Sequence, residues 1–113
     1  MLPKNRRLAR REFPQILKNG TRHNSQNLLM YSVFDNVQKS TKFSFSISKK
    51  NSKSSVERNK LRRWGYSVIT KHIKEIKPGF LCFFSFKKGS VKTEFQSLEN
   101  EILGLLSVSG VIS

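Results

Sequence analysis

The side chains with the clearest capacity for chemistry form a dense basic run in the middle of the chain. Between residues 49 and 63 the only acidic side chain is Glu57. The basic cluster consists of Lys49, Lys50, Lys53, Arg58, Lys60, Arg62 and Arg63, with Asn59 among them. Its first part is polar and turn-rich, and its second part begins a predicted helix. Side-chain cations and the partial positive charge of a helix N-terminus would therefore act together on an anion such as phosphate.

The overall charge helps to decide whether this cluster is more than a solvated surface. The 113 residues contain 22 Lys and Arg against 7 Asp and Glu, which gives a net charge of +15. On a chain of this size, such an imbalance favours a polyanionic partner. Residues 1–10 form a basic arm that we expect to be flexible, with almost nothing to bury, ahead of a single RNA-binding domain over 11–113. The arm and its boundary supply further phosphate contacts at Arg6, Arg7, Arg10 and Arg11.

The residues offer little support for catalysis by the protein itself. Hydrolysis of a phosphodiester needs a convergent acid and base, or carboxylates that hold metal ions. The seven carboxylates are dispersed along the chain, and His23 and His72 fall in unrelated elements. Cys82 stands alone in an apolar run, so neither a disulfide nor a zinc site is expected. We predict no catalytic residue and no metal site in the protein.

The cysteine content and the apolar runs also predict the cellular compartment of the protein. A single cysteine suits a reducing, intracellular environment, and the basic start is followed by more charge instead of the apolar stretch of a secretory signal. The longest strongly apolar run, 80–86, is far shorter than a membrane helix. We expect a cytoplasmic protein without a membrane partner.

Hydrophobic periodicity predicts the elements that position these residues. The predicted elements are a helix over about 11–19, strands over 28–34 and 42–48, a long helix over 56–76, a strand over 80–86, and a last helix over about 91–106 with Ser90 as its N-cap. In the strand over 42–48, large apolar residues alternate with Ser44, Ser46 and Ser48, which gives one core face and one open face. The fold class is α+β, a single small domain with a central sheet.

Two segments together resemble the signature of the bacterial ribonuclease P protein subunit. They are FSISKK at 45–50 and, after a short polar loop, VERNKLRR at 56–63. The basic arm, a Phe-containing helix that ends at Gly20, and a strand that carries Tyr31 match the family in the same order. Lys60 replaces an arginine of the family's Arg-Asn-Arg box, serines stand at 44 and 52 where the family has glycines, and Gly65 and Tyr66 also depart from the pattern.

The resemblance implies an αβββαβα-like order with a left-handed βαβ crossover, as in the second domain of ribosomal protein S5. It also implies that catalysis belongs to an RNA subunit, which the basic cluster binds, and that Mg²⁺ acts through this RNA. One protein per RNA is expected, and no DNA partner. The precursor tRNA would place its single-stranded 5′ leader in a cleft between the first helix and the sheet. The cleft residues implied are Phe13, Leu17, Leu29, Tyr31, Ser46 and Ser48.

Other interpretations remain open at this point. Phe13, Leu17 and Tyr31 also fit ordinary core packing, because apolar residues at helical or strand spacing are usually buried. The whole chain also fits a ribosomal or other structural RNA-binding protein with no role in catalysis. A basic membrane-surface protein fits less well, because no long amphipathic basic helix is free of core packing. A dependence of RNA binding on the 5′ leader would distinguish a ribonuclease P subunit from a structural RNA-binding protein.

Overall fold

A four-stranded sheet lies at the centre of the computed structural model, which describes residues 2–113. The strands are β1 (Thr21–Asn24), β2 (Leu28–Phe34), β3 (Lys42–Ser46) and β4 (Phe80–Phe86). Their order in the sheet is β1-β2-β4-β3, with β1 and β4 antiparallel to β2 and with β3 parallel to β4. The sheet therefore has β1 and β3 as its two edges.

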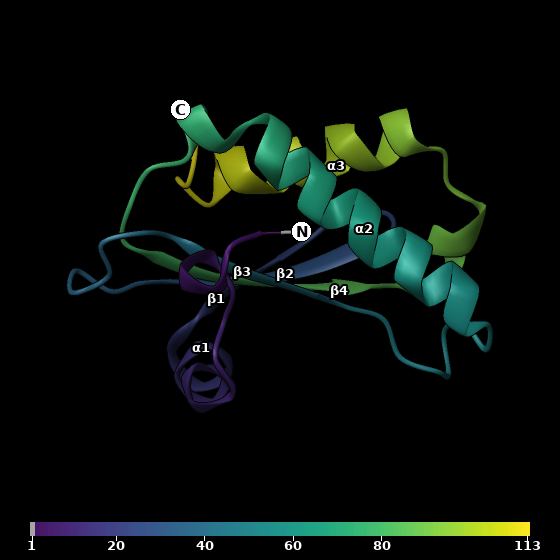
Figure 1. The fold of residues 1–113 in the computed structure, drawn as a ribbon, viewed down its shortest axis with the longest axis horizontal. Helices are drawn as coiled ribbons and strands as arrows, with labels where there is room; N and C mark the ends of the chain where they lie inside the picture. Colours follow the sequence, from purple (N-terminus) through teal and green to yellow (C-terminus); the bar gives the residue numbers. More distant parts are fainter. Residues whose placement is uncertain (1) are drawn as a thin grey trace.

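Helices cover the two faces of this sheet unequally. The helices α2 (Ser55–Lys71) and α3 (Phe95–Val108) lie on one face, and the short α1 (Phe13–Asn19) lies on the other (Figure 1). The predicted α+β fold and its αβββαβα order are confirmed, including the helical connection between the parallel strands β3 and β4. The left-handedness of this connection stays a prediction. In the part of the chain described, no helix is both long and apolar enough to cross a membrane.

The core lies between the sheet and the pair α2 and α3. Phe43, Phe45 and Ile47 are buried there, as their alternation with serines predicts. The Phe45 ring stacks on Phe84 at 4.7 Å between centroids. A Cβ at Gly65 would lie 2.5 Å from the Phe45 ring, so the glycine allows α2 to approach β3 closely. This close contact explains why a glycine stands inside α2, although glycine costs about 1 kcal/mol relative to alanine within a helix.

The long helix is shorter than predicted. It ends at Lys71, and a separate 3-10 helix, Ile73–Glu75, follows. The His72 side chain lies between Glu75 and Glu99, and the backbone leaves the helical conformation at that residue. At the other end of α2, Val56 was expected to face the core but is 74% exposed.

Two further boundaries differ from prediction. The strand predicted over 42–48 ends at Ser46, because residues 48–52 form a hydrogen-bonded turn in place of further strand pairing. The last helix begins at Phe95, after a 3-10 helix, Lys88–Lys92. Ser90 is not its N-cap: the hydroxyl of this buried serine donates to the Lys87 carbonyl.

The strand β1 is the one strand for which periodicity gave no location. Its sequence, TRHN, is polar and largely exposed, so it lacks apolar alternation. Backbone pairing with β2 and the turn at 25–27 define it instead. The Glu101 carboxylate of α3 holds that turn, accepting hydrogen bonds from Ser25 and from the backbone and side chain of Asn27 at 2.5–2.8 Å.

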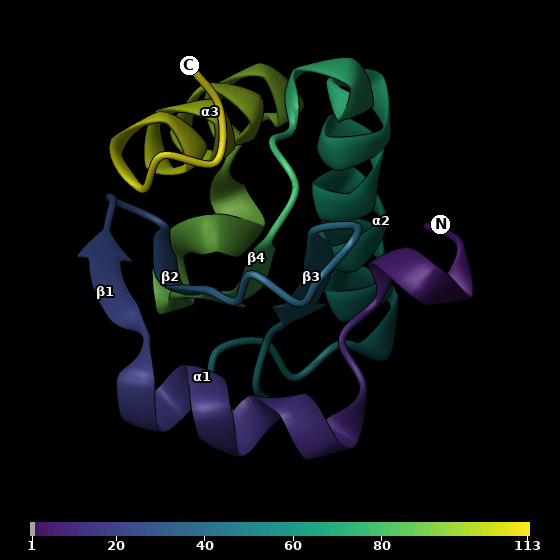
Figure 2. The ribbon, with the colours of Figure 1, turned by 90° about the vertical axis from the view of Figure 1, so that its left-hand side faces the viewer.

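The N-terminal arm crosses the exposed edge of β3. Figure 2 shows it running from beside α2 past β3 to α1. Leu2 is buried in the core, and the Leu8 N–H donates to the Phe43 carbonyl at 3.1 Å. The expectation that this arm has almost nothing to bury is therefore wrong for Leu2. Backbone pairing along an edge strand also protects that edge from association. The flexibility of the arm in solution stays a prediction.

Candidate nucleic-acid interface

Side chains from three strands form rows across the face of the sheet on which α1 lies. Cross-strand partners point to the same face. The rows are Ser46–Ser85–Leu29, Ser44–Phe83–Tyr31 and Lys42–Leu81–Val33. We call this set the open face; Leu81 in its last row is fully buried, and the other members are partly exposed. Leu29 and Tyr31 were expected on the strand beside the serines, but β4 lies between β3 and β2 and contributes a middle residue to each row.

Phe83 is the main residue of the open face that sequence reasoning missed. The whole strand over 80–86 was assigned to the core, and this assignment is wrong for Phe83, which is only partly buried. Its ring contacts Phe13 edge-on at 5.3 Å and lies nearly parallel to Tyr31 at 6.3 Å. The sequence did contain a signal for this position. Ser85 is polar and lies two residues after Phe83, so the two side chains point to the same face of the strand, away from the core.

The other residues predicted for the cleft differ in their positions. Leu29, Tyr31 and Ser46 are partly exposed on the open face, as the cleft requires. Leu17 is 56% exposed, and the fully buried Ile16 anchors α1 in its place. Ser48 lies beyond the end of β3, where its hydroxyl accepts from the Asn51 N–H at 3.2 Å.

The basic cluster begins in the turn after β3 and continues along α2. Ser54 is the N-cap of α2 and accepts from the Glu57 N–H at 3.3 Å. The Arg58 guanidinium turns back to donate to the Ser52 carbonyl at 2.7 Å. Arg58 therefore ties the turn to the helix as well as adding charge. The exposed members of the cluster are Lys49, Lys50, Lys53, Asn59 and Arg63.

Two other members of the cluster have partners on α2. Arg62 donates to the side-chain oxygen of Asn59, one turn earlier. The Lys60 ammonium lies over the Trp64 ring at 4.9 Å, and Trp64 in turn contacts Phe95 of α3. These contacts orient the side chains in advance, which lowers the entropy lost when an anion binds. Arg58 and Arg62 were expected to project together, but their guanidinium groups contact different partners.

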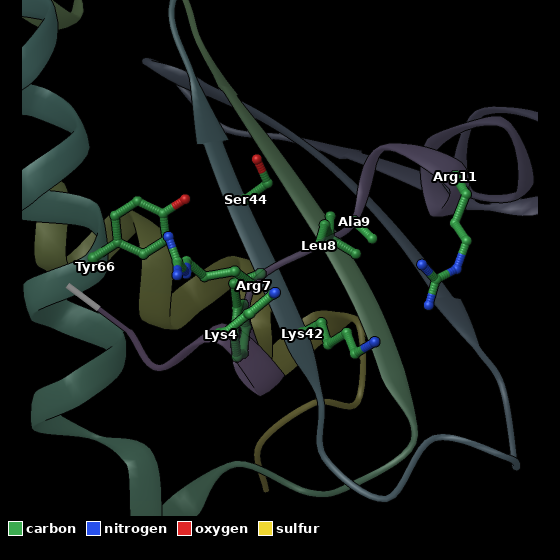
Figure 3. Close-up of a pocket in the computed structure, with 9 residues that line it drawn as sticks. Lys4, Arg7, Leu8, Ala9, Arg11, Lys42, Ser44 and Tyr66 are labelled. Atoms are coloured by element: carbon green, nitrogen blue, oxygen red, sulfur yellow. The ribbon is translucent and has the colours of Figure 1, made fainter.

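A second basic site lies where the arm crosses β3. A pocket lies at this crossing, and Figure 3 shows the residues that line it; its volume is about 500 Å³. Of the arm residues predicted to contact phosphate, Arg7 and Arg11 line it, whereas Arg6 and Arg10 do not. Its other lining residues are Lys4, Leu8, Ala9, Lys42, Phe43, Ser44 and Tyr66. Sequence reasoning missed the pocket because it depends on contacts between residues far apart in the chain.

The two basic sites lie toward opposite ends of β3. The pocket includes Lys42 and Ser44, whereas the cluster begins three residues after Ser46. The open face lies alongside the strand between them. Ser44 lines the pocket and Lys49 begins the cluster five residues later, so at about 3.3 Å per residue the chain separates the two sites by at most roughly 17 Å.

Three titratable groups outside these sites have pKa values that their surroundings shift. Glu99 of α3 lies between Lys71 and His72, and the Lys71 hydrogen bond lowers its pKa. Hydrogen bonds to Glu75 and Glu99 raise the pKa of His72. Burial raises the pKa of the Cys82 thiol. Among residues 2–113, no three His, Cys, Asp or Glu side chains converge on a point where a metal could bind.

The fold and these surfaces define a small basic α+β protein whose two basic sites flank a partly exposed face of the sheet. The chain belongs to the Ribonuclease P family, whose model matches residues 2–109. It is 31% identical over 112 residues to the ribonuclease P protein component of Synechocystis sp., with 98% of this chain and 90% of that protein covered.

Solved structures have the same fold. The RNase P protein of Staphylococcus aureus is similar with a TM-score of 0.87 and 18% identity, covering 98% of this chain and 100% of that one. The RNase P protein of Thermotoga maritima is similar with a TM-score of 0.79 and 22% identity, covering 88% and 94%. The family resemblance stated from the sequence is therefore confirmed.

Proposed function

We propose that this chain is the protein subunit of a cytoplasmic ribonuclease P and promotes removal of the 5′ leader from precursor tRNA. The RNA subunit carries out the cleavage, with Mg²⁺ bound through the RNA. One protein binds each catalytic RNA, and neither DNA nor a membrane takes part. The protein contributes substrate discrimination and charge neutralisation.

The basic cluster is the proposed contact with the catalytic RNA. Its exposed lysines and Arg63 are available to phosphates, and Arg62 and Asn59 form a preoriented pair on α2. A net charge of +15 reduces repulsion between two RNA molecules. Release of counterions from the phosphates then makes binding strongly dependent on salt.

The leader is proposed to cross the open face. The observation that supports this most is the aromatic row of Tyr31 and Phe83, with Phe13 of α1 against it, between two basic sites. Single-stranded RNA binds such surfaces by stacking, at about 1–3 kcal/mol per base. Mature tRNA lacks the leader and cannot use this surface, which gives the discrimination. The arm cations Arg6, Arg7, Arg10 and Arg11 add phosphate contacts.

The test is cleavage of a precursor tRNA by the cognate catalytic RNA at low Mg²⁺, with and without the protein. We expect strong stimulation by the protein and no cleavage by the protein alone. High Mg²⁺ should restore much of the activity of the RNA alone, because added cations substitute for the protein's charge. Tight RNA binding without stimulation would instead indicate a structural RNA-binding protein. Cleavage by the protein alone would contradict the assignment of catalysis to the RNA.

A further inference from the structure

The pocket between the arm and β3 combines several features of an anion site. Its charged lining residues are Lys4, Arg7, Arg11 and Lys42, all of them cations. In Figure 3, Tyr66 and Arg11 lie toward its two ends, with the other three cations between them. Bringing like charges into one concavity costs electrostatic energy unless an anion occupies it.

Neutral donors add to this charge. Ser44 and Tyr66 contribute hydroxyl groups to the lining. The Tyr66 hydroxyl accepts from the Phe45 N–H at 3.4 Å, so its own proton can point to a ligand. A hydroxyl and a cation together are the groups that recognise a phosphate oxygen.

Backbone and side-chain contacts hold the pocket in shape. The Leu8 N–H bonds to the Phe43 carbonyl and anchors the arm on β3. Glu12 accepts from the Ala9 N–H at 2.7 Å and pairs with Lys42 at 3.1 Å. This carboxylate offsets one cation and leaves a net positive pocket.

We propose that this pocket binds consecutive phosphates of a single RNA strand. The proposal rests on the function proposed above and adds a specific site to it. The volume of about 500 Å³ is larger than one phosphate requires, and the cations are spread along the pocket. Ser44 belongs both to the pocket and to the central row of the open face, so one strand can run from the stacking surface into the pocket. The strand is either the precursor leader or a segment of the catalytic RNA, and the experiment separates these sources.

The test compares two double variants of the full-length protein, each with two fewer charges. Lys4→Gln with Arg11→Gln removes two pocket cations. Lys74→Gln with Lys92→Gln is the matched control, because both residues are exposed, neither lines the pocket, and neither belongs to the basic cluster or the arm. Circular dichroism and thermal melting establish that both variants fold. All four residues are exposed, and the backbone anchors of the arm remain.

Two binding assays are made across a range of salt concentrations. One measures the protein with the catalytic RNA alone, and the other measures the holoenzyme with precursors of increasing leader length and with mature tRNA. Removing the cations that neutralise two single-stranded phosphates should reduce the salt slope by about 1.4 and weaken binding roughly 25-fold at 0.1 M salt. Weaker binding confined to leader-bearing precursors identifies the leader, and weaker binding in the first assay identifies the catalytic RNA.

The proposal is overturned if the pocket variant matches the control variant in both assays. This result differs from failure of the proposed function, in which the wild-type protein does not stimulate cleavage. If wild-type stimulation is intact and the two variants are equal, only the pocket assignment fails.

Discussion

At the scale of single residues, Tyr31 and Phe83 share the central row of the open face. Both rings are partly buried, and Phe83 contacts both Tyr31 and Phe13. Tyr31→Ala should weaken binding of leader-bearing precursor about tenfold, because stacking of one base is worth about 1–3 kcal/mol. Affinity for mature tRNA should not change. Binding of the holoenzyme to both RNAs, measured in parallel, checks this.

Phe34→Ala is the matched control for this prediction. Phe34 is on the same strand and is 62% exposed, but its ring contacts Phe80 at the end of the sheet and not the open face. It should leave binding of both RNAs unchanged. Equal losses of affinity for precursor and mature tRNA in a folded Tyr31 variant would mean that the tyrosine is merely structural.

Substitutions at Arg58 and Arg62 distinguish the effect of charge on RNA binding from the effect on local structure. Charge reversal at either residue should weaken binding to the catalytic RNA and reduce the salt slope by about 0.7–0.9 for each phosphate that is no longer neutralised. Only Arg58→Glu should also loosen residues 48–53, because only Arg58 bonds to the Ser52 carbonyl. Salt titrations measure the first effect and amide hydrogen exchange the second. An unchanged salt slope for both variants would contradict the assignment of the basic cluster.

At the scale of elements, the contact between α2 and β3 depends on Gly65. Gly65→Ala would place a Cβ 2.5 Å from a Phe45 ring that is itself packed against Phe84 and Phe86. Overpacking at the upper end of its usual range, about 3 kcal/mol, exceeds the gain in helix propensity of about 1 kcal/mol. We expect a net decrease of about 2 kcal/mol in the free energy of unfolding, measured with urea.

Gly104→Ala on α3 is the control for that substitution. Gly104 is exposed and a Cβ there meets no atom within 4 Å. It should stabilise the protein by up to about 1 kcal/mol, because only helix propensity changes. Stabilisation by Gly65→Ala as well would show that the contact between α2 and β3 tolerates a larger separation.

The C-terminal end of α2 is joined to α3 by ionisable groups. His72 contacts Glu75 at 2.6 Å and Glu99 at 3.1 Å, and its pKa is raised above 6.5. A raised pKa stabilises the fold below pH 6.5, and the effect disappears as pH rises through the folded-state value. The pKa of Glu99 is lowered from 4.5, so its contribution is present above pH 4.5 and is lost in more acidic solution.

His72 and Glu99 together should therefore stabilise the fold most between about pH 4.5 and 6.5. The difference in unfolding free energy between wild type and His72→Gln should be larger at pH 5.5 than at pH 8.5. Urea denaturation at the two pH values measures it. A difference independent of pH would mean that the histidine acts through packing alone.

At the scale of the whole molecule, Cys82 reports global stability. Its side chain is fully buried in the core, and burial raises the pKa of the thiol. Alkylation should therefore require unfolding, since the thiolate is the reactive form. Catalytic RNA at 100 times its Kd should add about 2.7 kcal/mol of stability and slow labelling about 100-fold. Rapid labelling of the folded protein would show local opening of β4.

The sequence by itself determined the family, the fold class, the basic cluster and most elements. These depend on local signals: the FSISKK and VERNKLRR segments, the alternation in 42–48, and apolar runs that matched β2 and β4 at both ends. Helix ends were less predictable, because His72 and Ser90 form contacts that local periodicity does not reveal.

The tertiary structure alone decided which strands are neighbours and which cations converge. Placing β4 between β2 and β3 brings Phe83 into the open face, and no periodicity within one strand specifies strand order. The pocket joins Lys4, Lys42 and Tyr66, which are separated by tens of residues. Such proximity results from long-range backbone pairing and core packing, whereas sequence patterns report mainly the preferences of neighbouring residues.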